Sequence, residues 1–125
     1  DGNIYYNVDR ALIVRTKDID TVQKANQKVY DLASEGVVIR SATPRYIFTG
    51  LNAIKPDMIG EATKNAREAA ARFASDSGAQ VGAILNANQG LFSITARDGG
   101  SNEDEGTFVD KTVRVVTTVN FMIKD

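Results

Sequence analysis

The sequence predicts an α+β fold of order β-α-β-α-β-β, in which two helices cover one face of a four-stranded sheet. Three observations lead to this prediction. Two segments repeat apolar residues every three or four positions, as amphipathic helices do. Each follows an apolar, β-rich run, and the last third of the chain holds two long strand-like stretches around a glycine-rich loop. A chain of 125 residues is long enough for one domain with one core.

The first half of the chain predicts a strand, a helix and a second strand. Residues 10–16 form an apolar run flanked by charge, which is typical of a strand with both faces partly covered. A helix over residues 18–35 is indicated by its apolar spacing, with Asp18 or Asp20 as the N-terminal cap and Gly36 as the stop. Residues 37–49 follow as a β-rich stretch. It contains Pro44, which cannot donate to a ladder, so we expect an edge strand or a bulge there.

A second helix is predicted over residues 56–77, with Pro56 as its first residue and Gly78 as its stop. Its expected inward stripe is rich in alanine, which lets a helix backbone approach a sheet closely. The stripe consists of Ile59, Ala62, Ala66, Ala69, Ala70, Phe73 and Ala74.

Two strands joined as a hairpin are predicted for the remainder, over residues 80–96 and 107–124. In the first strand the apolar positions change from odd to even numbers, which predicts a bulge near Asn88–Gly90 because one extra residue reverses the alternation. In the second strand the odd-numbered residues are mostly apolar and should face the core.

Composition excludes several function classes. The chain has neither His nor Cys, which removes disulfides, thiolate nucleophiles and most zinc sites and hydrolase triads. Its net charge of −1 argues against non-specific electrostatic binding to nucleic acid. No apolar run approaches the ~18 residues that span a bilayer, so we expect no membrane insertion by this segment. No phosphate-binding or other cofactor motif is present, so we expect no cofactor. Carboxylate, lysine, tyrosine or serine chemistry stays open, but the prediction is that the protein is not an enzyme.

Two sets of polar residues are candidates for binding. Asn86, Asn88 and Gln89 could line a polar groove at the predicted bulge; the alternative is that they set the register of an irregular strand. The loop between the last two strands concentrates carboxylates that could bind a metal such as calcium, and the alternative is a solvated hairpin tip. These candidate metal ligands are Asp98, Glu103, Asp104 and Glu105.

Several segments resemble the C-terminal part of the SIMPL-domain family of bacterial envelope proteins. These segments are TGLNAIKP (49–56), EATKNAR (61–67), FASDSG (73–78), NQGLFSI (88–94) and KTVRVVTTV (111–119). The resemblance implies a single SIMPL-like domain over residues 1–125, a C-terminal fragment of a longer chain. It also implies a periplasmic or envelope location, a link to oxidative-stress protection and assembly into homo-oligomers. It supplies no agreed enzymatic activity and no catalytic residues.

Two hypotheses of function follow. The first is a non-enzymatic cell-envelope protein that acts through self-association or through an envelope protein partner. The second is a module that binds a small ligand or a metal at the strand bulge or the acidic loop.

Overall fold

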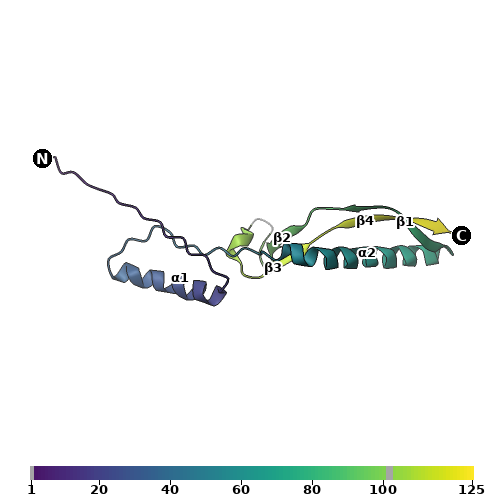
Figure 1. Cartoon of the computed structure of the whole chain (residues 1–125), viewed down its shortest axis with the longest axis horizontal. Coiled ribbons are helices and arrows are strands. Elements are labelled where there is room, and N and C mark those ends of the chain that lie inside the picture. The colour runs from purple at the N-terminus through teal and green to yellow at the C-terminus, as the bar shows by residue number, and fades with distance from the viewer. Residues whose placement is uncertain (1, 101–102) are drawn as a thin grey trace. The chain divides into compact units, whose positions relative to one another are not determined.

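The computed structural model describes residues 2–100 and 103–125, which form two helices, four strands and a short 3₁₀ turn (Figure 1). The elements are α1 (Ile19–Ser34), α2 (Leu51–Asp76), β1 (Gln80–Gln89), β2 (Ser93–Ala96), the turn η1 (Glu105–Thr107), β3 (Lys111–Arg114) and β4 (Thr117–Lys124). The chain divides into two compact units, Asp1–Pro44 and Arg45–Asp125. The α+β class is therefore confirmed, with all of the described strands in the second unit.

The first unit contains helix α1, and its ends lie where the sequence predicts them. Asp18 caps the helix: its carboxylate accepts hydrogen bonds from Thr21 N at 3.2 Å and from Thr21 Oγ1 at 2.7 Å. Gly36 follows with φ of +88°, in the left-handed region that glycine adopts without strain. Val22 and Val29 are half-buried, but no residue of α1 is buried.

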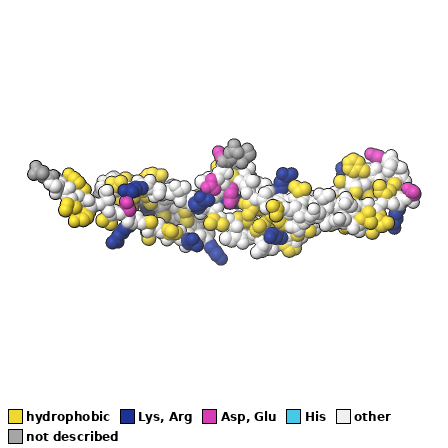
Figure 2. Space-filling model, turned by 90° about the horizontal axis from the view of Figure 1, so that it is seen from above, with side chains coloured by type: hydrophobic (Ala, Val, Ile, Leu, Met, Phe, Trp, Pro, Cys, Tyr) yellow, Lys and Arg dark blue, Asp and Glu magenta, His cyan; other side chains and the backbone are white. Residues whose placement is uncertain are grey.

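The prediction of a single four-stranded sheet with both helices on one face is wrong. The described strands form two separate two-stranded sheets. Residues 10–16 and 37–49, predicted as strands, form none in the structure. Leu12 and Ile13 are 90% and 79% exposed, and Figure 2 shows apolar side chains at the surface. The physical reason is that an apolar, β-rich run reports only the local preference for extended backbone, whereas a strand also requires a hydrogen-bonding partner from elsewhere in the chain.

In the second unit, α2 packs against the ribbon formed by β1 and β4. The helix begins at Leu51, earlier than predicted, so Pro56 lies inside it rather than at its first position. The side toward the ribbon carries half-buried or buried residues spaced three to four apart. They are Leu51, Ile54, Lys55, Met58, Ile59, Ala62, Thr63, Ala66, Ala70 and Ala74.

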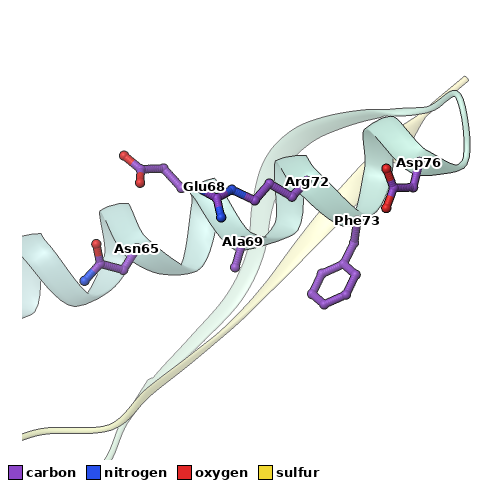
Figure 3. Close-up of a pocket in the computed structure, with 6 residues that line it drawn as sticks. All are labelled: Asn65, Glu68, Ala69, Arg72, Phe73 and Asp76. Carbon is purple, nitrogen blue, oxygen red and sulfur yellow. The ribbon is translucent and has the colours of Figure 1, made fainter.

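The predicted inward stripe is wrong at two positions. Ala69 is exposed and Phe73 is 80% exposed, with its ring directed away from the helix (Figure 3). The ribbon beneath α2 has only two strands, so it covers a narrower strip of the helix than a four-stranded sheet would. Arg67 fastens the helix to this ribbon: its guanidinium lies 4.9 Å from the centroid of the Phe121 ring and donates to Gly82 O at 3.3 Å.

The predicted hairpin is confirmed as two antiparallel pairs that follow one another, β1 with β4 and β2 with β3. The odd-numbered residues from Lys111 to Phe121 are half-buried and the even-numbered ones are exposed, as the alternation predicts.

The hairpin has an irregularity in its pairing next to Asn88–Gly90, where the sequence predicts a bulge. Gln89 pairs with Thr117 and Ser93 pairs with Arg114, so three residues on one side face two on the other. Gly90 N donates to Val116 O at 2.8 Å within this gap. Two further register shifts, not predicted, lie between Val81 and Ile84 and between Ile84 and Asn86.

Candidate functional site

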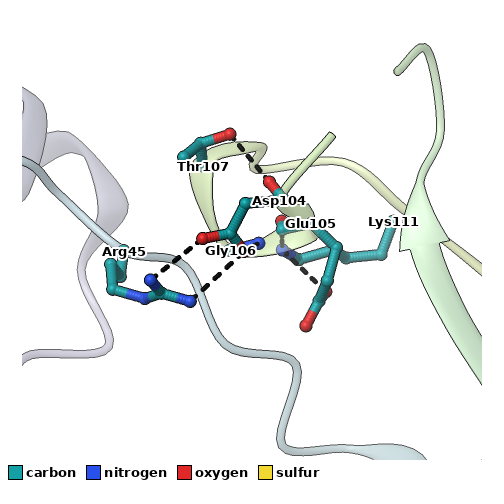
Figure 4. A network of polar contacts seen from close by, with 6 residues as sticks. All are labelled: Arg45, Asp104, Glu105, Gly106, Thr107 and Lys111. Atoms are coloured by element: carbon teal, nitrogen blue, oxygen red, sulfur yellow. Dashed lines mark hydrogen bonds and ion pairs between the residues drawn. The ribbon is translucent and has the colours of Figure 1, made fainter. Parts of the chain in front are cut away.

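The loop that joins β2 to β3, residues 97–110, is held to the segment before α2 by a charged contact (Figure 4). Arg45 Nη1 lies 3.0 Å from Asp104 Oδ2, and Arg45 Nη2 donates to Asp104 Oδ1 at 3.2 Å. The Asp104 carboxylate also accepts from Gly106 N at 2.9 Å, and Tyr46 N donates to Gly106 O at 2.7 Å. Gly106 is buried, and a Cβ at this position would lie only 2.6 Å from Arg45 Nη2, so the close approach of the arginine depends on glycine here. We call this loop the hairpin tip.

A second cation lies beneath the hairpin tip. Lys111 belongs to the inward face of β3, and its side chain is only 6% exposed. Its ammonium group lies 3.1 Å from Glu105 Oε2 and donates to the Glu105 carbonyl oxygen as well. A charge so far from water requires such partners, since transfer of an unpaired ammonium into the protein interior is costly.

The remaining carboxylates of the hairpin tip are also engaged, with Arg97 or with a backbone N–H group. Asp98 Oδ2 lies 2.8 Å from Arg97 Nη2, and Arg97 Nη2 is 2.9 Å from Asp110 Oδ2. Glu103 Oε2 accepts from Gly100 N at 3.0 Å. The four predicted ligands therefore do not converge, and residues 2–100 and 103–125 contain no group of three or more acidic side chains that could hold a metal ion. Metal binding by Asp98, Glu103, Asp104 and Glu105 stays a prediction.

Hydrogen bonding sets the protonation behaviour of the hairpin tip. The Gly106 N–H, with the Arg45 guanidinium, lowers the pKa of Asp104 below its usual 3.8. The hydrogen bond from Arg97 lowers the pKa of Asp98, and the same contact raises the pKa of Arg97. These contacts therefore favour the charged form of Asp98 and Asp104.

The lowered pKa of Asp104 predicts a dependence of stability on pH. A carboxylate whose pKa is depressed on folding contributes stability above its unfolded pKa of about 3.8, and this contribution is lost as the pH falls through the folded value. We expect Asp104→Asn to lower the melting temperature at pH 7 and to differ less from the unchanged protein at pH 2, as measured by circular dichroism. Glu61→Gln, on an exposed part of α2, is the control. An equal deficit at both pH values would contradict the prediction.

Asn86, Asn88 and Gln89 lie on β1, and all three are exposed. Asn86 faces Asn120 across the ribbon, and Asn88 faces Thr118, both also exposed. Between these two, Val119 is half-buried, so the two asparagines belong to the exposed face of the ribbon. Ligand binding by these residues stays a prediction.

Two shallow hollows border the exposed Phe73 ring, and neither is lined by Asn86, Asn88 or Gln89. One lies along α2 and is lined by Asn65, Glu68, Ala69, Arg72, Phe73 and Asp76 (Figure 3). The other lies between the end of α2 and the ribbon, where Ala70 and Ala74 meet Val119 and Phe121. Neither hollow brings a carboxylate next to a hydroxyl or lysine nucleophile, as acid–base or covalent catalysis would need.

The sequence analysis missed the two cations that partner the hairpin tip. Lys111 carries a signal that could have found it: it occupies an inward position in an alternating strand, so its charge requires an anion nearby. Arg45 carries no such signal, because nothing local distinguishes it from a solvated arginine next to Pro44.

The fold and these contacts define a class: a small α+β protein in which a long helix covers an antiparallel hairpin with a charged tip. A model of the SIMPL family, described as a protein of unknown function (DUF541), matches residues 1–121. The chain belongs to the SIMPL family. The comparisons with curated proteins and with solved structures found no significant match. In the part of the chain that the structure describes, no helix combines the length and apolar character required to cross a bilayer.

Proposed function

We propose that this SIMPL protein is a non-enzymatic protein of the cell envelope that acts by associating with further copies of itself. The observation that carries the proposal is the amount of apolar side chain left at the surface. Among the described residues only Ala74 and Ala96 are buried apolar residues, whereas Tyr5, Tyr6 and Leu12 are 84%, 85% and 90% exposed. Exposed apolar patches of this kind mark surfaces that associate with other proteins.

The accessible surface gives the scale of this exposure. Large apolar side chains are exposed in both units: Leu12 is 90% exposed in the first and Leu91 is 93% exposed in the second. Association of copies would remove apolar area from water at about 25 cal/mol per Å², which is the main driving force available to this sequence.

Two further lines support a role without catalysis in the envelope. The chain lacks His and Cys, and the hairpin-tip carboxylates, which could act as acids or bases, are engaged with cations or backbone N–H groups. The envelope location and the link to oxidative-stress protection rest on the resemblance of residues 49–119 to bacterial SIMPL proteins.

Mass measurement in solution tests the proposal. We expect multi-angle light scattering of the chain to give a mass of two or more copies, with an equilibrium that shifts toward larger species as concentration rises. Lysine-directed crosslinking should capture the same species. Leu12→Ser/Ile13→Ser should weaken association, and Val22→Ser, at a half-buried position of α1, should instead lower stability. A strict monomer at high concentration would contradict the proposal.

A further inference from the structure

Strand β1 is an edge strand, and its run Asn86–Gln89 lacks the usual protection against pairing. In the described part of the chain it pairs with β4 alone, so the N–H and C=O groups along its other side have no ladder partner. Between Asp76 and Arg97 the sequence contains no charged residue and no proline. Natural edge strands are normally blunted by lysine, inward charge, proline or β-bulges, and an edge without them accepts another strand. The bulges of β1 lie before Asn86 and after Gln89, so the run between them has none of these features.

The partner strands β3 and β4 differ from β1 in this respect. They carry Lys111, Arg114 and Lys124, and Asp110 and Asp125 adjoin their ends. The open side of β4 is therefore charged at its end, while the open side of β1 is neutral along its whole length. This contrast indicates which of the two edges of the ribbon is suited to accept another strand.

The side chains of β1 indicate what kind of strand it accepts. When two β1 strands pair antiparallel about a two-fold axis, a residue near the axis lies opposite itself or a close neighbour in the other copy. A charged residue would meet its own like charge, which is destabilising. An amide has two N–H donors and a carbonyl acceptor, so it can hydrogen-bond to a second copy of itself. Asn86, Asn88 and Gln89 are exposed amides in the longest regular run of β1, which pairs with Thr117–Asn120 without a register shift.

We propose that two copies of this chain pair through the open edges of their β1 strands, antiparallel and about a two-fold axis within Asn86–Gln89. The result is a continuous four-stranded sheet of order β4-β1-β1-β4, with one α2 helix from each copy. This inference rests on the proposed self-association and adds to it a specific interface in the second unit, separate from the exposed Leu12 and Ile13 of the first. The bulges between Val81 and Asn86 confine the regular pairing to the half of β1 that carries the amides.

Charge placed on this edge tests the interface. We expect Asn86→Lys/Asn88→Lys to raise the dissociation constant at least about tenfold and to reduce the measured mass to half or less, because lysines then face lysines across the axis. The matched control is Thr118→Lys/Asn120→Lys, which places the same charges on the cross-strand partners, on the same exposed face but on β4. Mixing the lysine variant with Asn86→Glu/Asn88→Glu should restore association as a heterodimer.

A second measurement does not depend on a charged variant folding. The chain has no cysteine, so Ala87→Cys introduces a single thiol next to the proposed axis. We expect it to form a disulfide between copies on mild oxidation, while Thr118→Cys on β4 forms far less.

The possible results separate the two proposals. If the unchanged protein associates but neither the lysine pair nor Ala87→Cys behaves as expected, pairing through β1 is wrong and self-association stands. If the unchanged protein is monomeric, both are wrong. Equal loss of association in the β1 and β4 lysine variants would also overturn pairing through β1.

Discussion

Replacement of Gly90 by alanine is expected to destabilise the chain by about 1–3 kcal/mol, the usual cost of forcing an extra methyl group into a packed site. A Cβ at this position would lie 2.9 Å from the carbonyl oxygen of Val116, a backbone atom that cannot swing aside. The same glycine donates its N–H to that oxygen at 2.8 Å, so relief of the clash also stretches a hydrogen bond at the junction of β1 and β2. Urea unfolding followed by circular dichroism measures the change.

Gly60→Ala is the matched control for this experiment. Gly60 lies inside α2, and a Cβ there meets no atom within 4 Å. Alanine costs less conformational entropy in a helix than glycine, so we expect a gain of about 0.5–1 kcal/mol. Opposite signs for the two glycine substitutions are the expected result. A Gly90→Ala protein as stable as the unchanged one would show that the hairpin junction can open without loss.

Replacement of Glu105 by glutamine is expected to destabilise the chain by about 1–3 kcal/mol, because it leaves the Lys111 ammonium group without its counter-charge. The lysine side chain is 6% exposed, whereas that of Glu105 is 44% exposed. The exposed side of the pair reduces the expected cost below the 3–5 kcal/mol of a fully buried ion pair. Thermal and urea unfolding at neutral pH measure the difference.

A double-mutant cycle isolates this ion pair. Lys111→Met keeps most of the length of the buried side chain and removes its charge, so we expect Lys111→Met/Glu105→Gln to be more stable than Glu105→Gln alone. Lys64→Met is the control, since Lys64 lies 3.9 Å from Glu68 in a pair exposed to solvent, which is typically worth under about 1 kcal/mol. Additive effects of the Lys111 and Glu105 substitutions would show that the two charges do not support each other.

Sequence reasoning worked best where structure is decided by neighbours in the chain. The ends of α1 follow from one capping aspartate and one glycine with positive φ, both of which act over a few residues. The hairpin follows from two strand-like stretches joined by a glycine-rich loop, so the partner of each strand lies close to it in the sequence. The change of parity near Gly90 was visible because a bulge alters the side-chain alternation of the strand that contains it.

The failures concern partners that lie far away in the sequence. Residues 10–16 have the composition of a strand, but composition does not supply the second strand that a ladder needs. The expected burial of Phe73 assumed a wide sheet beneath α2, and the observed ribbon has two strands. The hairpin-tip carboxylates were grouped because they are neighbours in sequence, yet Asp104 bonds to Arg45 and Glu105 to Lys111. A list of acidic residues does not reveal which cations neutralise them.

The register shifts of the hairpin have a mechanical consequence. All three place the additional residue on the same side, in residues 80–96, so this side of the hairpin is longer than the side formed by residues 111–124. Two joined strips of unequal length must bend, with the longer strip on the outside of the curve, and bulged strands bend in this way. The bowed path of β1 and β4 over α2 in Figure 1 therefore reflects the additional residues on the β1 side of the hairpin. Deleting one residue at a bulge would flatten the hairpin and change how closely it follows the helix.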